Sequence, residues 1–243
     1  MMKILIVGAT GKTGLRLVTQ LLAEGHSVTA IVRTTEKLPQ NIRNHENLSI
    51  TTSTILDMNH EDVIQHVENC DAIVSCLGHT VDFRGLFGHP RRLVSDSVQR
   101  LCQAVQVNSP SNPVKLLLMS SVGCRNSDAE EKISFAQLCV IGLLRLLVPP
   151  HSDNEKAANY LRTMIGQNNS HIEWTAIRPD DLIENDEVSS YSIQVSPMRS
   201  IFNAGKTSRI NVAHFMVQLI TDTGTWSKWK GHMPVIYNDV TGS

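Results

Sequence analysis

Short runs of apolar residues alternate along the chain with longer segments in which apolar residues recur at helical spacing. The apolar runs that we expect to form strands are residues 4–7, 28–32, 48–52, 72–77, 114–119 and 174–177. The segments that we expect to form helices are residues 13–24, 59–68, 92–107, 153–168 and 212–220. This alternation is typical of a parallel sheet whose strands are joined by helices.

Two of the runs, Leu5–Val7 and Leu116–Met119, lack polar alternation, which is typical of strands that are buried on both faces. The pattern therefore predicts an α/β fold with a doubly wound parallel sheet, a Rossmann fold, joined by right-handed crossovers. We expect one domain over residues 1–243. Within it, residues 180–243 are expected to contribute a small C-terminal lobe on the substrate side.

A glycine-rich turn, Gly8-Ala9-Thr10-Gly11-Lys12-Thr13-Gly14, joins the first predicted strand to the first predicted helix. In a dinucleotide-binding turn the first glycine permits the tight turn, the second admits the pyrophosphate and the third lets helix and strand approach. Backbone N–H groups at the helix N-terminus then bind phosphate, and the hydroxyls of Thr10 and Thr13 add donors. The alternative is a plain strand–turn–helix, but the surrounding alternation favours a dinucleotide site.

The composition mainly excludes classes of protein. The 243 residues include 22 Lys plus Arg and 23 Asp plus Glu, so a net charge of −1 gives no reason to expect nucleic acid or an anionic membrane. Five cysteines without a C-x-x-C pair indicate a reducing compartment. The longest apolar stretch, residues 133–148, is shorter than the roughly 20 residues that span a membrane, and no signal peptide precedes the first strand. We expect a soluble cytoplasmic protein.

Further motifs follow the glycine turn at the ends of the predicted strands. They are Val32-Arg33, Asp57-Met58, Asp71-Ala72-Ile73-Val74 with Leu77-Gly78, Ser120-Ser121, Arg178-Pro179, and Thr207-Ser208-Arg209 before Val212-Ala213-His214-Phe215-Met216. With these motifs and its G-x-x-G-x-x-G spacing, the chain resembles the atypical short-chain dehydrogenase/reductases, specifically the NAD(P)H-binding group that includes biliverdin-IXβ/flavin reductase. The resemblance covers nearly the whole chain.

The resemblance also implies where a bound dinucleotide would lie. It places Asp57 and Met58 beside the adenine, and it places Ser120 and Pro179 among the cofactor-binding residues. It places Cys76, Leu77 and Gly78 along the middle of the cofactor. An alternative role for Asp57 is to cap the N-terminus of the following helix, which is worth about 1 kcal/mol.

The residues after the second predicted strand bear on the choice of dinucleotide. A site that prefers NAD has an acidic residue here, whereas this chain has Arg33, with Lys37 four residues further on. A guanidinium matches the oxygens of a 2′-phosphate, and Lys12 could also point toward the adenosine ribose. A basic loop in solvent is the alternative, but the resemblance places the 2′-phosphate at Arg33. We therefore expect NADP(H) as the cofactor.

The catalytic residues of the resembling family are only partly present. Classical members use a serine, a tyrosine that moves the proton, and a lysine four residues after the tyrosine. Ser121, or Ser120, stands where the family has its serine, and Lys156 matches the lysine. Four residues before Lys156 is Ser152 instead of tyrosine. Reduction of an ordinary carbonyl by the classical triad is therefore not expected.

The sequence leaves several other candidate proton donors. Tyr160 falls one helical turn after Lys156, while Tyr191 and Tyr237 are distant in sequence. His151, just before the predicted helix, is a candidate acid, and the alternative is a loop histidine in solvent. His214 is expected to be structural.

One apolar segment is expected near the substrate. Residues 133–148 lie where this fold builds its substrate rim, and their large apolar residues share one broad face. They are Phe135, Leu138, Ile141, Leu144 and Leu147. The two interpretations are an ordinary packed helix and a hydrophobic lid over an aromatic acceptor.

These observations give one leading hypothesis and one rival. The leading hypothesis is an NADPH-dependent oxidoreductase that reduces a flavin, quinone or similar conjugated acceptor, because such rings accept hydride without a strong acid. The rival is a non-catalytic sensor that binds NADP(H) and regulates a partner. An isomerase or epimerase is disfavoured by Arg33 and by the missing tyrosine. We expect a small-molecule electron acceptor as the partner, a monomer or homodimer, and no metal.

Overall fold

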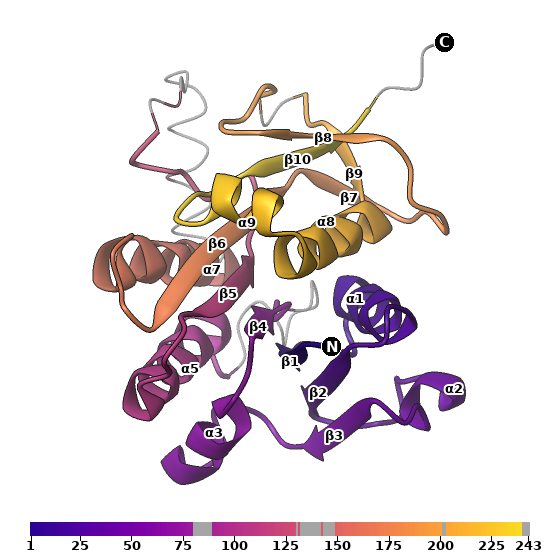
Figure 1. Ribbon diagram of the computed structural model, residues 1–243. Helices are drawn as coiled ribbons and strands as arrows, with labels where there is room; N and C mark the ends of the chain where they lie inside the picture. The colour runs from indigo at the N-terminus through magenta and orange to yellow at the C-terminus, as the bar shows by residue number, and fades with distance from the viewer. Residues whose placement is uncertain (80–88, 130, 132–141, 143–148, 201–202, 240–243) are drawn as a thin grey trace.

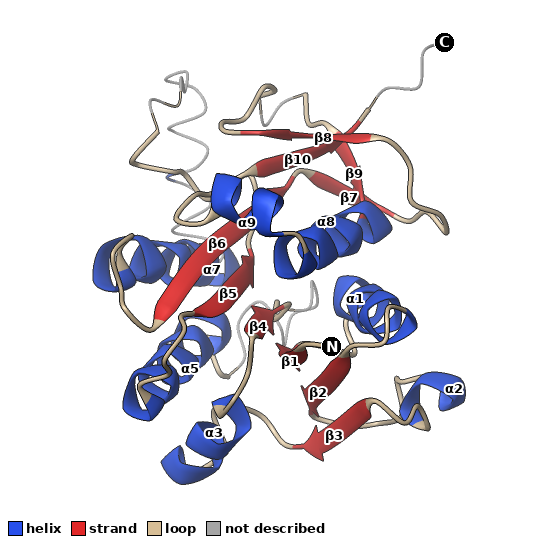
Figure 2. Ribbon diagram, in the orientation of Figure 1, coloured by secondary structure: helices blue, strands red, loops and turns tan. Residues whose placement is uncertain are grey.

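The computed structural model describes residues 1–79, 89–129, 131, 142, 149–200 and 203–239. Its centre is an eight-stranded sheet with the order β3-β2-β1-β4-β5-β6-β10-β8 (Figures 1 and 2). Neighbouring strands are parallel except for β10 and β8. The strands are β1 (Lys3–Val7), β2 (Ser27–Val32), β3 (Leu48–Thr52), β4 (Ala72–Ser75), β5 (Val114–Met119), β6 (Ile172–Pro179), β8 (Tyr191–Gln194) and β10 (Val235–Asn238).

Helices cover both faces of the sheet (Figure 2). One face is covered by α3 (His60–Val67), α5 (Leu93–Asn108) and α7 (Pro149–Tyr160), which continues as the π-helix η1 (Leu161–Ile165). The other face is covered by α1 (Lys12–Ala23), α8 (Arg209–Thr221) and α9 (Thr223–Trp229), with α1 packed against α8. The short helix α2 (Gln40–Arg43) precedes β3. The doubly wound sheet predicted from the sequence is therefore confirmed.

Strand β1 shows how the sequence builds this core. Ile4 and Ile6 pack with α1 and α8, whereas Leu5 and Val7 pack with α3 and α5, because successive side chains of a strand point to opposite faces. All four are at most 1 % exposed. The prediction that this run is buried on both faces is confirmed.

The strand order reverses between β1 and β4. From β1 the chain first builds outward through β2 and β3, and then returns to add β4, β5 and β6 on the other side. Open α/β sheets bind ligands at such a switch point, in the crevice beyond the carboxyl ends of the strands. This reversal places the glycine turn after β1 at the centre of the carboxyl edge.

Several element boundaries differ from those predicted, most clearly those of β4 and α7. Strand β4 ends at Ser75 rather than at residue 77, because residues 76–77 leave the sheet to pack over the glycine turn. Helix α7 begins at Pro149 rather than at residue 153, since proline is tolerated in a first helical turn. The regular α-helix then ends at Tyr160, and the π-helix that continues it ends at Ile165.

The C-terminal third joins the main sheet. Strands β10 and β8 extend it beyond β6, while β7 (Asp181–Ile183) and β9 (Lys206–Ser208) form a separate parallel pair. Helix α8 begins at Arg209, and the Ser208 side chain caps it by accepting a hydrogen bond from the Asn211 N–H.

The apolar segment 133–148 lies outside the described residues, apart from Gly142, so its expected role as a substrate rim stays a prediction. None of the helices in the described part of the chain is long and apolar enough to cross a membrane.

Candidate dinucleotide site

The three glycines of the turn after β1 are each required by close backbone packing. Gly8 has φ +82°, and a Cβ there would lie 2.5 Å from the carbonyl carbon and oxygen of Cys76. A Cβ on Gly14 would collide with the carbonyl oxygen of Gly8, and one on Gly11 would lie 3.2 Å from the same oxygen. The turn is closed by the Gly11 N–H, which donates to the Gly8 carbonyl over 3.0 Å. Side chains are thus excluded where a pyrophosphate would approach.

The N-terminus of α1 is suited to bind an anion. Gly11 is its N-cap residue, and no side chain of the described residues caps it. The first turn contains no acidic residue, so its N–H groups and the positive end of the helix dipole meet no carboxylate of that turn. Thr13 is buried and Thr10 is half-buried in the turn. The loop and helix together fit a diphosphate.

The carboxyl end of β2 presents a basic side chain to solvent. Arg33 directly follows β2 and is exposed, as is Lys37. Within the described part of the chain, neither side chain forms an ion pair or a hydrogen bond. Because β2 lies beside β1, a ligand bound on the glycine turn would extend past Arg33. The guanidinium therefore fits a 2′-phosphate.

Lys12 points elsewhere. Its Nζ lies 2.9 Å from Oε1 of Glu184, which directly follows β7. Arg16 and Arg209 also contact the Glu184 carboxylate, at 2.9 Å and 3.5 Å. The hydrogen bond from Lys12, together with the nearby guanidinium groups, holds the pKa of Glu184 below its ordinary value. The structure thus directs Lys12 toward the residues after β7, whereas the sequence suggested the adenosine ribose.

A side chain of α5 binds the segment that is predicted to lie beside the adenine. Arg100 donates to the carbonyl oxygens of Leu56 and Met58 over 2.7 Å and 2.6 Å. The Asp57 carboxylate accepts from Thr54 Oγ1 over 2.7 Å. The alternative role suggested for Asp57, capping the next helix, is wrong, because Asn59 caps α3. The sequence did not indicate Arg100, whose partners are backbone atoms far away in the chain.

Cys76 and Leu77 pack over the glycine turn, because a Cβ on Gly8 would meet their backbone. The Cys76 N–H donates to the Val7 carbonyl over 2.9 Å, and Gly78 is exposed. Burial raises the pKa of Cys76 to about 12, so its thiol is no nucleophile at neutral pH. That residues 76–78 line the middle of a bound dinucleotide stays a prediction.

The predicted catalytic residues Ser121 and His151 both lie against Gly123. A Cβ on Gly123 would be 3.0 Å from His151 Cε1 and 3.5 Å from Ser121 Oγ. His151 is half-buried within α7, with Nε2 3.6 Å from Glu155, so its description as a loop histidine is wrong. The structure therefore brings together a serine after β5 and a histidine on α7.

The remaining predicted residues lie near this group or at the ends of the same strands. Ser120 and Pro179 are buried, at the carboxyl ends of β5 and β6. Lys156 is on α7 and exposed. Tyr160, one turn later, is half-buried, and burial raises the pKa of its phenol. Among the described residues, no group of three or more His, Cys, Asp or Glu side chains could hold a metal ion.

A buried ion pair that the sequence did not predict stabilises this edge of the sheet. Arg178, at the end of β6, is 0 % exposed and lies 2.6 Å from Glu131 Oε1. Its guanidinium also donates to the carbonyl oxygens of Cys124, Met233 and Val195. Arg178 thus ties the loop after β5 to the segments beside β10 and β8.

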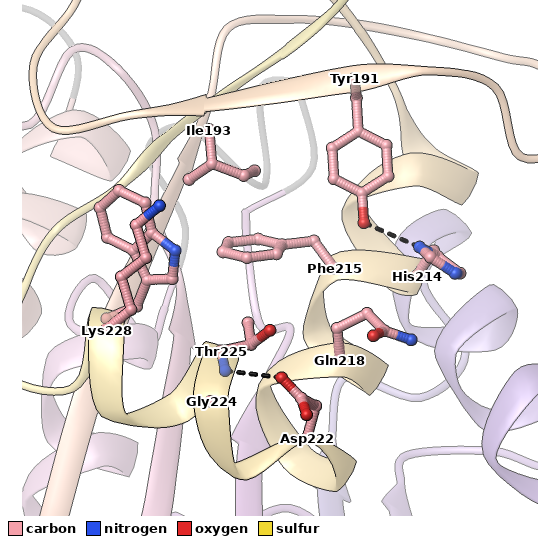
Figure 3. Close-up of a pocket in the computed structure, with 10 residues that line it drawn as sticks. Tyr191, Ile193, His214, Phe215, Gln218, Asp222, Gly224, Thr225 and Lys228 are labelled. Carbon is pink, nitrogen blue, oxygen red and sulfur yellow. Dashed lines mark hydrogen bonds between the residues drawn. The ribbon is translucent and has the colours of Figure 1, made fainter.

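The other two tyrosines serve elsewhere. Tyr191 is hydrogen-bonded to His214 Nδ1 over 2.8 Å, in a pocket of ≈ 660 Å³ between β8, α8 and α9 (Figure 3). Tyr237 Oη accepts from the Met198 N–H over 3.2 Å. The lining of this pocket contains none of the predicted cofactor residues. Tyr191 and His214 therefore form a pair apart from the glycine turn.

The strand order and the glycine turn define a dinucleotide-binding Rossmann protein. A family model described as NAD(P)H-binding matches residues 8–223, and the chain belongs to this NAD(P)H-binding family. No protein with a curated description matches the chain.

Solved structures share the fold at low identity. A short-chain dehydrogenase/reductase from Veillonella parvula in complex with NADP is 17% identical, with a TM-score of 0.71, over 100% of this chain and 97% of that chain. A proposed NADH-flavin reductase from Streptococcus pneumoniae is 18% identical, with a TM-score of 0.67, over 98% and 100%. ChuY, an anaerobillin reductase from Escherichia coli, is 16% identical, with a TM-score of 0.68, over 99% and 100%. The atypical short-chain dehydrogenase/reductase fold indicated by the sequence is confirmed.

Proposed function

We propose that this chain is an NADPH-dependent oxidoreductase that reduces a flavin, quinone or similar conjugated small molecule. The observation that carries the proposal is the exposed Arg33 at the end of β2, beside a glycine turn that excludes side chains. When bound, the dinucleotide would supply a hydride from its nicotinamide. The NADP in the Veillonella parvula structure supports this choice of cofactor.

Different residues of the chain bind different parts of the dinucleotide. Gly8, Gly11, Gly14 and the hydroxyls of Thr10 and Thr13 hold the diphosphate. Arg33 and Lys37 hold the 2′-phosphate, with Lys12 close to the turn. Asp57 and Met58 border the adenine, residues 76–78 line the middle, and Ser120 and Pro179 border the nicotinamide.

The choice of a conjugated acceptor rests on the absence of the proton-donating tyrosine from its expected position in α7. Ser152 stands where a proton-donating tyrosine is expected, and the half-buried Tyr160 is a poor acid because its pKa is raised. A conjugated ring tolerates this loss, because it accepts hydride before a weak acid or solvent supplies the proton. Ser121, His151 and Lys156 would then orient the acceptor. The names of the flavin and anaerobillin reductases agree with such an acceptor.

The serine at position 152, in place of a tyrosine, also favours a second candidate, a non-catalytic NADP(H) sensor. One assay separates the two: the purified chain is mixed with NADPH or NADH and with flavin mononucleotide, menadione or a conjugated enone, and the absorbance of the reduced cofactor is followed. We expect turnover with NADPH and at least one flavin or quinone. Tight NADPH binding without turnover of any of the three acceptors would contradict the enzyme and favour the sensor.

A further inference from the structure

A buried histidine–aspartate pair lies at the carboxyl edge of the sheet, beyond β4. His79 Nε2 is 2.9 Å from Asp153 Oδ2, and the two side chains are 6% and 1% exposed. His79 directly follows Gly78, and Asp153 is on α7. The pair thus joins the strand beside the phosphate turn to the helix that carries His151.

The Asp153 carboxylate is surrounded by hydrogen-bond donors. Besides His79, its carboxylate accepts hydrogen bonds from the backbone N–H groups of Val94 and Ser95, over 2.8 Å and 3.0 Å, and from the Ser95 hydroxyl. The two N–H groups belong to the first turn of α5, where the helix dipole is positive. Two carboxylate oxygens have lone pairs for all four donors, whereas a protonated acid has to donate one hydrogen itself. Asp153 is therefore an acceptor for an Nε2–H of His79.

The pair lies on the far side of the switch point from Arg33. Strand β4 is the neighbour of β1, and Cys76 packs directly on Gly8. The segment 76–79 therefore leads from the phosphate turn toward α7, away from β2. A dinucleotide whose 2′-phosphate lies at Arg33 would direct its other end toward this segment.

We propose that His79 donates the proton taken up by the reduced acceptor, with Asp153 as the residue that positions the imidazole. This inference rests on the proposed function. A bound NADPH would supply one hydride, which carries both electrons, to the acceptor. His79 would give the acceptor one proton through Nδ1, and solvent would restore that proton. NADPH, acceptor and one proton thus give NADP⁺ and the reduced acceptor.

Two observations favour this role over a purely structural tie. The tyrosine that would donate the proton is replaced by Ser152, and Asp153 is the next residue. Imidazole is also a side chain that ordinarily exchanges a proton near neutral pH. A tie between β4 and α7 alone needs only a neutral donor.

Other charged groups on the packed helices must be considered for the pH dependence. Among the described residues, α5 contributes Asp96, which is paired with the preceding Arg92 over 3.2 Å, and Arg100, which donates to the carbonyl oxygens of Leu56 and Met58. Helix α7 contributes Asp153, the exposed Lys156 and the His151–Glu155 pair. Of these groups, Asp153 forms the polar contact with the ring of His79. The variants below therefore change the donor or its direct partner.

The test is His79→Gln, whose amide can still donate to Asp153. With NADPH and flavin mononucleotide or menadione we expect kcat to fall by about 100-fold or more at neutral pH. The decline of wild-type kcat toward alkaline pH should disappear, while the Kd for NADPH and the Tm stay close to wild type. Asp153→Asn should lower kcat while the Kd for NADPH stays close to wild type, because the His79 ring loses the carboxylate that positions it. The matched control is His232→Gln, at an exposed histidine before β10, and should behave as wild type.

Three results would overturn the inference. A His79→Gln enzyme with wild-type kcat and pH profile would show that the proton comes from elsewhere, while leaving the reductase proposal intact. Loss of NADPH binding in a folded His79→Gln protein would give His79 a role in shaping the cofactor site. A wild-type protein that binds NADPH but reduces none of the acceptors would remove the proposed function, and this inference with it.

Discussion

Lys12 of the phosphate turn forms an ion pair with Glu184, with 2.9 Å between Nζ and Oε1, and so links the start of α1 to the segment after β7. Arg16 and Arg209 contact the same carboxylate. Three cations thus surround one carboxylate beside the turn that we expect to hold a diphosphate. The carboxylate would repel a dinucleotide bound on this turn, and it holds Lys12 in an ion pair.

Glu184→Gln should therefore tighten NADPH binding. Removing one charge near a surface phosphate site is worth about 1 kcal/mol, or roughly a fivefold lower Kd at low salt. Calorimetric titration with NADPH measures the effect, and added salt should reduce it. The exposed Glu187 offers a control, Glu187→Gln, with an unchanged Kd. Weaker binding in Glu184→Gln would instead mean that the ion pair positions the turn for the cofactor.

Arg33→Ala should separate the two dinucleotides. A charge-assisted hydrogen bond to the 2′-phosphate contributes about 2 kcal/mol, so the Kd for NADPH should rise roughly thirtyfold. The Kd for NADH, which has no 2′-phosphate, should change little. Lys228→Ala, on α9, is the control for a lost surface cation. Equal losses for both dinucleotides would refute the assignment of Arg33.

Gly8→Ala should be far more damaging than Gly25→Ala. Both glycines have positive φ, +82° and +77°, but a Cβ on Gly25 meets nothing within 4 Å, whereas one on Gly8 meets the Cys76 backbone at 2.5 Å. Gly25→Ala should cost about 1 kcal/mol of unfolding free energy, the strain of the left-handed conformation. Gly8→Ala should cost about 2–4 kcal/mol and abolish NADPH binding, because the turn must also move. Urea denaturation and NADPH titration measure both, and equal costs would contradict the crowding.

Arg178→Met should destabilise the fold strongly, because it leaves the buried Glu131 carboxylate without its partner. Such losses cost about 3–5 kcal/mol of unfolding free energy. The control is Arg162→Met, which breaks an exposed pair with Asp128 at the same 2.6 Å separation and should cost at most about 1 kcal/mol. Similar costs in urea denaturation would show that the burial of Arg178 does not matter energetically.

The sequence predicted the fold where local pattern was sufficient. The run after Met2 alternates between two buried faces, and the glycine turn follows it at once, so β1 and the phosphate site were both predictable. The end of β4 was not, because Cys76 and Leu77 are as apolar as the strand before them. Only the proximity of Gly8 shows that these two residues leave the sheet.

The predicted catalytic residues show the same difference between what the sequence reveals and what the structure reveals. Ser121 and His151 were identified singly, from position and residue type, and the structure brings them together against Gly123. His79 was overlooked because no pattern joins it to Asp153, 74 residues further along the chain. A lone histidine after a predicted strand carries no signal of a buried carboxylate beside it.

By itself, then, the sequence determined the alternating elements, the glycine turn and the family, because hydrophobic period and backbone freedom are local properties of the chain. Tertiary structure decided which side chains meet. It paired Lys12 with Glu184, Arg178 with Glu131 and His79 with Asp153. These pairs depend on how the chain crosses over the sheet. Two of them, Arg178–Glu131 and His79–Asp153, are buried, and burial of such groups is tolerable only where the fold supplies a partner.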